Sequence, residues 1–165
     1  MSVLERTEQA YSPDEARPLR GYLTTMTTFG GVIAGLTALH RALGRPPPER
    51  VSTSDVVLIS IATHKLSRIL AKDAVTSPLR APFTRYQAPA GAAELNEVVR
   101  HSGGVRHAVG ELVTCPFCMA AWVATGLTAG LAFAPRFTRL VATAGTAVAA
   151  ADFLHLAYDA VKKRA

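Results

Sequence analysis

Residues 112–134 read LVTCPFCMAAWVATGLTAGLAFA and contain no charged side chain. At a rise of about 1.5 Å per residue, a helix of this length crosses the roughly 30 Å hydrocarbon core of a bilayer. Pro116 suits the first turn of such a helix, where the missing N–H costs no hydrogen bond. This stretch therefore predicts a membrane-spanning helix.

Three further segments are candidates for the same role. Residues 22–42 carry no charge before Arg41, and residues 139–159 are apolar between Arg139 and Asp152. Residues 54–72 give the weakest signal, because polar side chains interrupt a short apolar stretch. We expect an all-α integral membrane bundle of about four helices, with spans at about 22–42, 54–72, 112–134 and 139–159. The alternative for the first span is a buried core helix of a soluble protein.

The composition indicates lipid rather than nucleic acid as the environment of the chain. Hydrophobic residues make up 49% of the 165 residues and charged residues only 18%, against about 25% charged in an average soluble domain. The net charge is +6, but the basic residues sit at the ends of apolar segments and aromatic residues are only 7%. We therefore expect the lipid bilayer as a partner and no binding of nucleic acid.

The polar segments divide the chain. Residues 1–20 form a mobile polar tail or a short surface helix without the apolar core of a cleavable signal peptide, and residues 21–162 form the helical membrane domain. Three consecutive prolines make residues 44–50 a loop. Residues 73–110 are the longest connecting segment, with amphipathic helices expected around 92–99 and 105–113.

The basic residues predict the orientation in the membrane. With four spans, the N-terminal tail, the segment from Lys65 to Arg106 and the C-terminal tail hold thirteen Lys and Arg residues, whereas the opposite side holds five. The positive-inside rule then places the connecting segment and both termini in the bacterial cytoplasm, with the bundle in the cytoplasmic membrane.

Small residues recur at helical spacing within the predicted spans and allow close packing of helices in lipid. The candidates are Gly31, Gly35, Gly126, Gly130, Gly145 and Ala149. The sequence holds no phosphate-binding loop, no GxSxG and no HExxH. The first hypothesis is therefore a non-enzymatic structural or partner-binding protein that associates with itself or with another membrane protein.

Cys115 and Cys118 form a CPxC sequence at a predicted helix N-terminus, where the helix dipole favours a thiolate. One alternative function is therefore a thiol-redox protein. Another is a metal site, with zinc held by the two cysteines together with His101 and His107. The third interpretation is plain packing of two small side chains, and the sequence leaves all three open.

A set of ionisable residues falls within the second and fourth predicted spans. Their depths in the proposed topology are similar, so Asp152 is expected to pair with Lys65 or Arg68. The candidate network comprises His64, Lys65, Arg68, Asp152 and His155. It is either a minor proton or ion relay, or a tether between helices whose side chains reach toward the interface.

Three stretches carry a resemblance to a known family: THKLSR at 63–68, KDAVTSPLRAPFT at 72–84 and GELVTCPFC at 110–118. Together they resemble a bacterial domain-of-unknown-function family of small integral membrane proteins. The family is found in actinomycetes and Bacillus, where one member is named as a sporulation protein. The resemblance implies several membrane helices and supplies no catalytic residues. Residues 101–104 depart from the shorter turn of the family, which weakens a histidine-based metal site as a shared feature.

Overall fold

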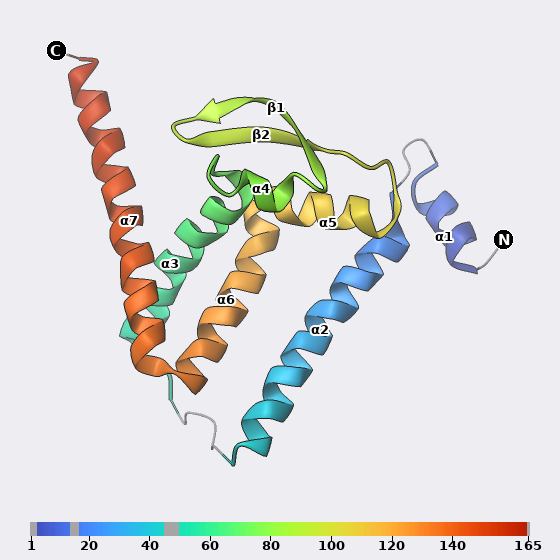
Figure 1. Ribbon diagram of the computed structural model, residues 1–165, viewed down its shortest axis with the longest axis horizontal. Coiled ribbons are helices and arrows are strands. Elements are labelled where there is room, and N and C mark those ends of the chain that lie inside the picture. The colour runs from blue at the N-terminus through green and yellow to red at the C-terminus, as the bar shows by residue number, and fades with distance from the viewer. Residues whose placement is uncertain (1–2, 14–16, 45–49, 165) are drawn as a thin grey trace.

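The computed structural model of the protein describes residues 3–13, 17–44 and 50–164, and the chain is mostly helical (Figure 1). The elements are α1 Val3–Tyr11, α2 Leu19–Ala42, α3 Thr53–Lys72, α4 Ser77–Arg80, β1 Thr84–Gly91, β2 Glu94–Val99, α5 Gly104–Thr114, α6 Pro116–Phe133 and α7 Pro135–Lys162. The three prolines of the predicted loop at 44–50 lie outside the described residues.

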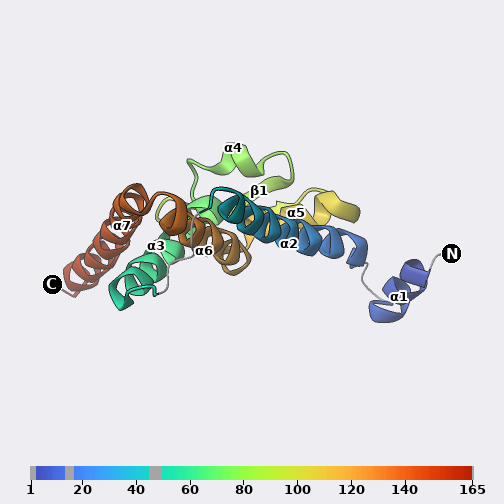
Figure 2. The same cartoon turned by 90° about the horizontal axis from the view of Figure 1, so that it is seen from below.

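Helix α3 packs against both α6 and α7. Helix α7 follows α6 after Ala134 alone, so the two run in opposite directions (Figure 1). Helix α2 packs chiefly against α5 and has few contacts with α6. The C-terminal part of α7 stands apart from the other helices, as two perpendicular views show (Figures 1 and 2).

The interior of the bundle is made of small and polar side chains. The buried apolar residues are Ala62, Ala71, Ala108, Leu127, Ala142 and Ala149. At the crossing of α3 and α7, a Cβ on Gly145 would lie 3.4 Å from the Cβ of Ala62, at van der Waals contact, so the two helices pack closely through small residues. The larger apolar side chains point outward: Met26 is 65% exposed and Leu154 is 71% exposed.

Local chemistry explains where the helices begin and why they tolerate threonine. The Ser52 hydroxyl accepts a hydrogen bond from the Asp55 N–H at 3.1 Å and caps α3. Pro116 and Pro135 occupy the first turns of α6 and α7. Threonine hydroxyls along α2 donate back to carbonyls of the preceding turn, which satisfies them without water.

The expectation of an all-α fold is wrong in the connecting segment. Strands β1 and β2 form an antiparallel hairpin in which Thr84 lies opposite Val99 and Tyr86 opposite Glu97. Residues 92–99, expected as a helix, contain β2, where Leu95, Glu97 and Val99 alternate with exposed neighbours. Glu94 and Glu97 are three residues apart, as on one face of a helix, but backbone pairing with β1 places both in a strand. Residues 105–113 do lie in a helix, α5.

The hairpin, α4 and α5 together form a polar cap at one end of the bundle (Figure 1). The N-terminal ends of α2 and α6 and the C-terminal end of α3 lie at this end. At the opposite end lie the last turn of α2, the first turn of α3 and the connection between α6 and α7. This polarity sets the positions of the charged residues described below.

Three described helices are long and apolar enough to cross a membrane: α2, α6 and α7. Helix α3 falls outside that group, in agreement with its weaker sequence signal. The structure therefore supports membrane association through these three helices.

Candidate functional site

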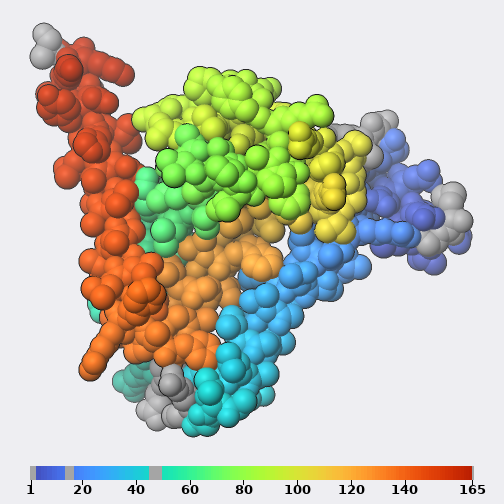
Figure 3. All heavy atoms as spheres, viewed as in Figure 1, coloured from blue at the N-terminus to red at the C-terminus, as the bar shows by residue number. Residues whose placement is uncertain are grey.

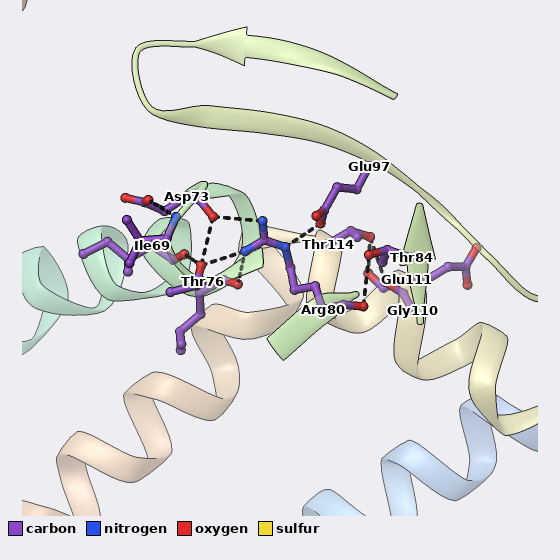
Figure 4. Close-up of polar contacts among 11 residues, drawn as sticks. Ile69, Asp73, Thr76, Arg80, Thr84, Glu97, Gly110, Glu111 and Thr114 are labelled. Atoms are coloured by element: carbon purple, nitrogen blue, oxygen red, sulfur yellow. Dashed lines mark hydrogen bonds and ion pairs between the residues drawn. The ribbon is translucent and has the colours of Figure 1, made fainter. Parts of the chain in front are cut away.

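The polar cap is built around one enclosed arginine, Arg80, whose exposed fraction is 1%. Its guanidinium donates to the carbonyls of Leu70 and Asp73, both at 2.9 Å, and to the Thr76 hydroxyl at 2.7 Å. Figure 4 shows these hydrogen bonds of Arg80 at the end of α3. Because the last carbonyls of a helix lack partners within it, Arg80 caps α3 with a side chain from the next element.

The charge of Arg80 is balanced by Glu97 on β2. The Arg80 Nε donates to the Glu97 carboxylate at 2.5 Å, and the Glu97 side chain is 6% exposed. A buried ion pair is tolerated only when its remaining polar atoms are also bonded, as they are for this guanidinium. The pair therefore fastens the hairpin to the end of α3.

A second pair holds the hairpin at its turn. Arg68 of α3 donates through Nε and Nη2 to the Glu94 carboxylate at distances from 2.7 to 3.0 Å. The backbone N–H of Ala74 also donates to the Ala93 carbonyl at 2.8 Å. Two ion pairs and one main-chain bond thus fix the hairpin over α3.

Glu111 of α5 joins the cap to the start of α2. Its carboxylate accepts from Arg17 at 2.9 Å and from the Tyr22 hydroxyl at 2.5 Å, and it lies 3.3 Å from the His107 Nε2. At the same crossing, a Cβ on Gly21 would lie 2.6 Å from the Gly104 carbonyl oxygen, so α2 and α5 are in backbone contact. Local sequence patterns do not indicate these contacts, because they join residues about ninety positions apart.

The cysteine pair lies at the start of α6, next to the cap: Cys115 separates α5 from α6, and Cys118 belongs to the first turn of α6. The two sulfurs of Cys115 and Cys118 are 2.7 Å apart, and the Cys115 Sγ accepts from the Cys118 N–H at 3.2 Å as the N-cap of α6. Both cysteines are free thiols, and Cys118 is exposed. This arrangement places a dithiol where an intramolecular disulfide needs only a small movement.

Of the two histidines of the zinc hypothesis, His107 has ring contacts with other residues, whereas the ring Nε2 of His101 has no hydrogen-bond partner among the described residues. The His107 Nδ1 lies 2.6 Å from the His101 carbonyl, and its Nε2 faces Glu111. Among the residues that the structure describes, no group of three or more His, Cys, Asp and Glu side chains could hold a metal ion. The zinc hypothesis therefore has no assembled ligand set in this part of the chain.

The candidate membrane network divides into separate contacts. Lys65 donates to Asp152 at 2.5 Å and so joins α3 to α7. Arg68 instead donates to the Glu94 carboxylate in the cap. His64 and His155 are exposed, and neither ring has a hydrogen bond to any described residue. Of the five residues, only Lys65 and Asp152 contact each other, and this pair joins α3 to α7.

At the end opposite the cap lies an ion pair that the sequence did not predict. Arg139 of α7 donates through Nε and Nη2 to the Asp55 carboxylate, both at 2.8 Å. Asp55 is 7% exposed and belongs to the first turn of α3. The pair joins residues 84 positions apart and fixes the base of α7 against α3.

The small residues predicted to pack fall into two groups. Gly145 and Ala149 are buried on α7, and a Cβ on Gly130 would lie 2.6 Å from the Thr138 hydroxyl. These three serve packing within the chain. A Cβ on Gly31, Gly35 or Gly126 would meet nothing within 4 Å. The second group therefore remains open on the outside of α2 and α6.

We predict that Arg80→Lys destabilises the cap by about 3–5 kcal/mol, because an ammonium cannot reach all four acceptors and leaves Glu97 partly unpaired. Thermal unfolding in detergent and protease cleavage within residues 84–99 measure the loss. Arg85→Lys is the matched control, since Arg85 is exposed on β1. Equal stability of the two variants would contradict the role given to Arg80.

We also predict that mild oxidation by diamide joins Cys115 and Cys118 within one chain, each thiol losing one hydrogen to the oxidant. Gel-shift labelling with a maleimide polymer counts the remaining thiols, and the expected number falls from two to none. Cys115→Ser and Cys118→Ser each keep one labelled thiol. Two labelled thiols in the oxidised wild-type protein would show that the sulfurs are held apart.

Comparison with known proteins places this geometry in a family. Residues 58–158 match the family described as "Protein of unknown function (DUF1360)". The chain is also 35% identical over 71 residues to a protein of Bacillus subtilis (strain 168) named "Sporulation protein YjcA". That alignment covers 42% of this chain and 60% of the relative, so the chain spans about three-fifths of the relative's length. No solved structure matches the chain.

The matched range contains every residue of the Arg80 cluster, the cysteine pair and the Lys65–Asp152 pair, whereas α1 and α2 precede it. This agrees with the resemblance that the three quoted stretches indicated. Because the match covers more than half of the chain, this protein belongs to the DUF1360 family of proteins of unknown function.

Proposed function

We propose that this protein is a non-enzymatic, multi-pass protein of the bacterial cytoplasmic membrane that carries a rigid polar cap. The inverted distribution of side chains is the observation that supports this most directly. Large apolar side chains such as Leu140 and Phe153 point outward, while the buried apolar positions are mainly alanine. A soluble protein of this size would turn the large apolar side chains inward, whereas lipid solvates them.

The charges support one orientation of the cap. Thirteen of the eighteen Lys and Arg residues belong to the side that carries the cap and both tails, which favours a cytoplasmic location under the positive-inside rule. In this proposal α3 is the fourth span. Helix α3 packs against α6 and α7, and Lys65 has its partner on α7, so that lipid need not solvate this charge.

The open face of α2 supports self-association as the mode of action. Gly31 and Gly35 are one turn apart, and a Cβ on either would meet nothing within 4 Å. On the other side of the helix, Ile33 and His40 face α6. A second copy could approach α2 through the two glycines as closely as α7 approaches α3 through Gly145.

The dithiol carries a second candidate function. The 2.7 Å separation of the two sulfurs at the start of α6 favours reversible thiol oxidation beside the cytoplasmic surface. In the reducing cytoplasm the pair would rest as free thiols and close only under oxidative stress. The diamide experiment above tests this candidate separately from the membrane proposal.

Cysteine accessibility tests the topology. In a Cys115→Ser/Cys118→Ser background, Arg85→Cys marks the cap and Leu43→Cys marks the opposite end, and both positions are exposed. A membrane-impermeant maleimide applied to intact cells should label Leu43→Cys and leave Arg85→Cys unlabelled until the cells are lysed. The reverse pattern would overturn the orientation. A chain that is monodisperse in buffer without detergent would overturn the membrane location.

Substitution on α2 tests self-association. Gly35→Leu places a bulky side chain on the open face and should shift the protein from dimer toward monomer in a crosslinking series in membranes. Ile33→Leu is the control, because it changes the opposite face of the same helix conservatively. Identical crosslinking of both variants and the wild-type protein would show that this face does not mediate association.

A further inference from the structure

A cavity in the described chain lies between α2 and α6, at the end opposite the cap. Its volume is about 640 Å³, within the range of about 300–1,000 Å³ that is typical of ligand sites. The two helices run side by side along the face shown in Figure 3. Apolar side chains line most of the cavity, among them Ile33, Leu36, Leu131 and Phe133. The walls are therefore suited to a hydrocarbon chain.

The polar end of the same cavity is strongly basic. Arg41, Arg50 and Arg139 line it, together with the single acid Asp55. Asp55 is already bonded twice to Arg139. Arg41 and Arg50 have no acidic partner among the described residues, and residues 45–49 add one arginine and one glutamate to the sequence. Among the described residues, two positive charges therefore stand at the mouth of an apolar cavity without an acidic partner.

His40 provides an independent observation that points to a ligand. Both of its ring nitrogens are shielded from solvent and lack a hydrogen-bond partner within the described chain. Its ring lines the cavity and packs edge-on against Phe133, with 5.4 Å between centroids. A buried imidazole without any partner is costly, and a ligand oxygen in the cavity would supply one.

On the proposed membrane location, we infer that this cavity binds one anionic phospholipid of the surrounding bilayer. One acyl chain lies between α2 and α6, and the phosphate lies at Arg41 and Arg50 within reach of His40. Guanidinium groups bind phosphate oxygens through paired N–H donors, which provides selectivity for an anionic headgroup. The lipid also fills the space between two helices that have few direct contacts with each other.

Native mass spectrometry of the purified, detergent-solubilised full chain tests this inference. We expect the wild-type protein to retain one phosphatidylglycerol and to bind phosphatidylcholine much more weakly. Arg41→Gln/Arg50→Gln should weaken phosphatidylglycerol binding roughly tenfold or more. Arg136→Gln removes a nearby charge that does not line the cavity and should leave binding unchanged. Ala129→Trp should displace the acyl chain with every arginine in place.

Three results would overturn the inference: equal binding of the two lipids, unchanged binding by the double arginine variant, or inorganic phosphate that competes as well as the lipid. A thermal unfolding curve for each variant separates loss of the site from loss of the fold. The membrane proposal fails independently, if the protein needs no detergent. A protein that requires detergent but selects no lipid would refute only the cavity assignment.

Discussion

The enclosed guanidinium of Arg80 is the interaction on which the cap depends. It bonds two carbonyls near the end of α3, the Thr76 hydroxyl and the Glu97 carboxylate at once. A two-stranded hairpin has little stability of its own, so β1 and β2 need this attachment to keep their place. Removal of the arginine would leave a buried acid and unpaired helix carbonyls together. One side chain therefore joins the secondary structure of the cap to the bundle.

Outside the cap, the chain is held together by a different kind of contact. Alanine and glycine let α3 and α7 approach closely, and single ion pairs fix the two helices at Lys65–Asp152 and Asp55–Arg139. A small apolar cluster around Leu127 adds to this packing, whereas many large apolar side chains, such as Leu140 and Phe153, are exposed. In lipid, close packing and paired charges take over the role that the hydrophobic effect has in water.

Helix α2 has a separate position in this architecture. It precedes the range that defines the family, and it is attached mainly through Gly21 and the Glu111 contacts at the cap. Its remaining length is loosely connected to the bundle, so one side lines the cavity and the other exposes Gly31 and Gly35. The family core thus supplies the rigid cap and α3–α7, and α2 supplies the surfaces proposed here for lipid and for a second copy.

The sequence by itself determined the long apolar helices, because the apolar runs at 22–42, 112–134 and 139–159 and the proline start at Pro116 are local properties. In the structure, the run at 112–134 is divided at Cys115, between the end of α5 and the start of α6. The sequence also indicated the approximate depth that brings Lys65 and Asp152 together, since rise per residue is fixed in a helix. Only the tertiary structure decided the hairpin, the enclosure of Arg80, the Asp55–Arg139 pair and which glycines stay open. Each of these depends on contacts between residues distant in the chain. Sequence alone does not distinguish an arginine that is exposed to solvent from one that is buried.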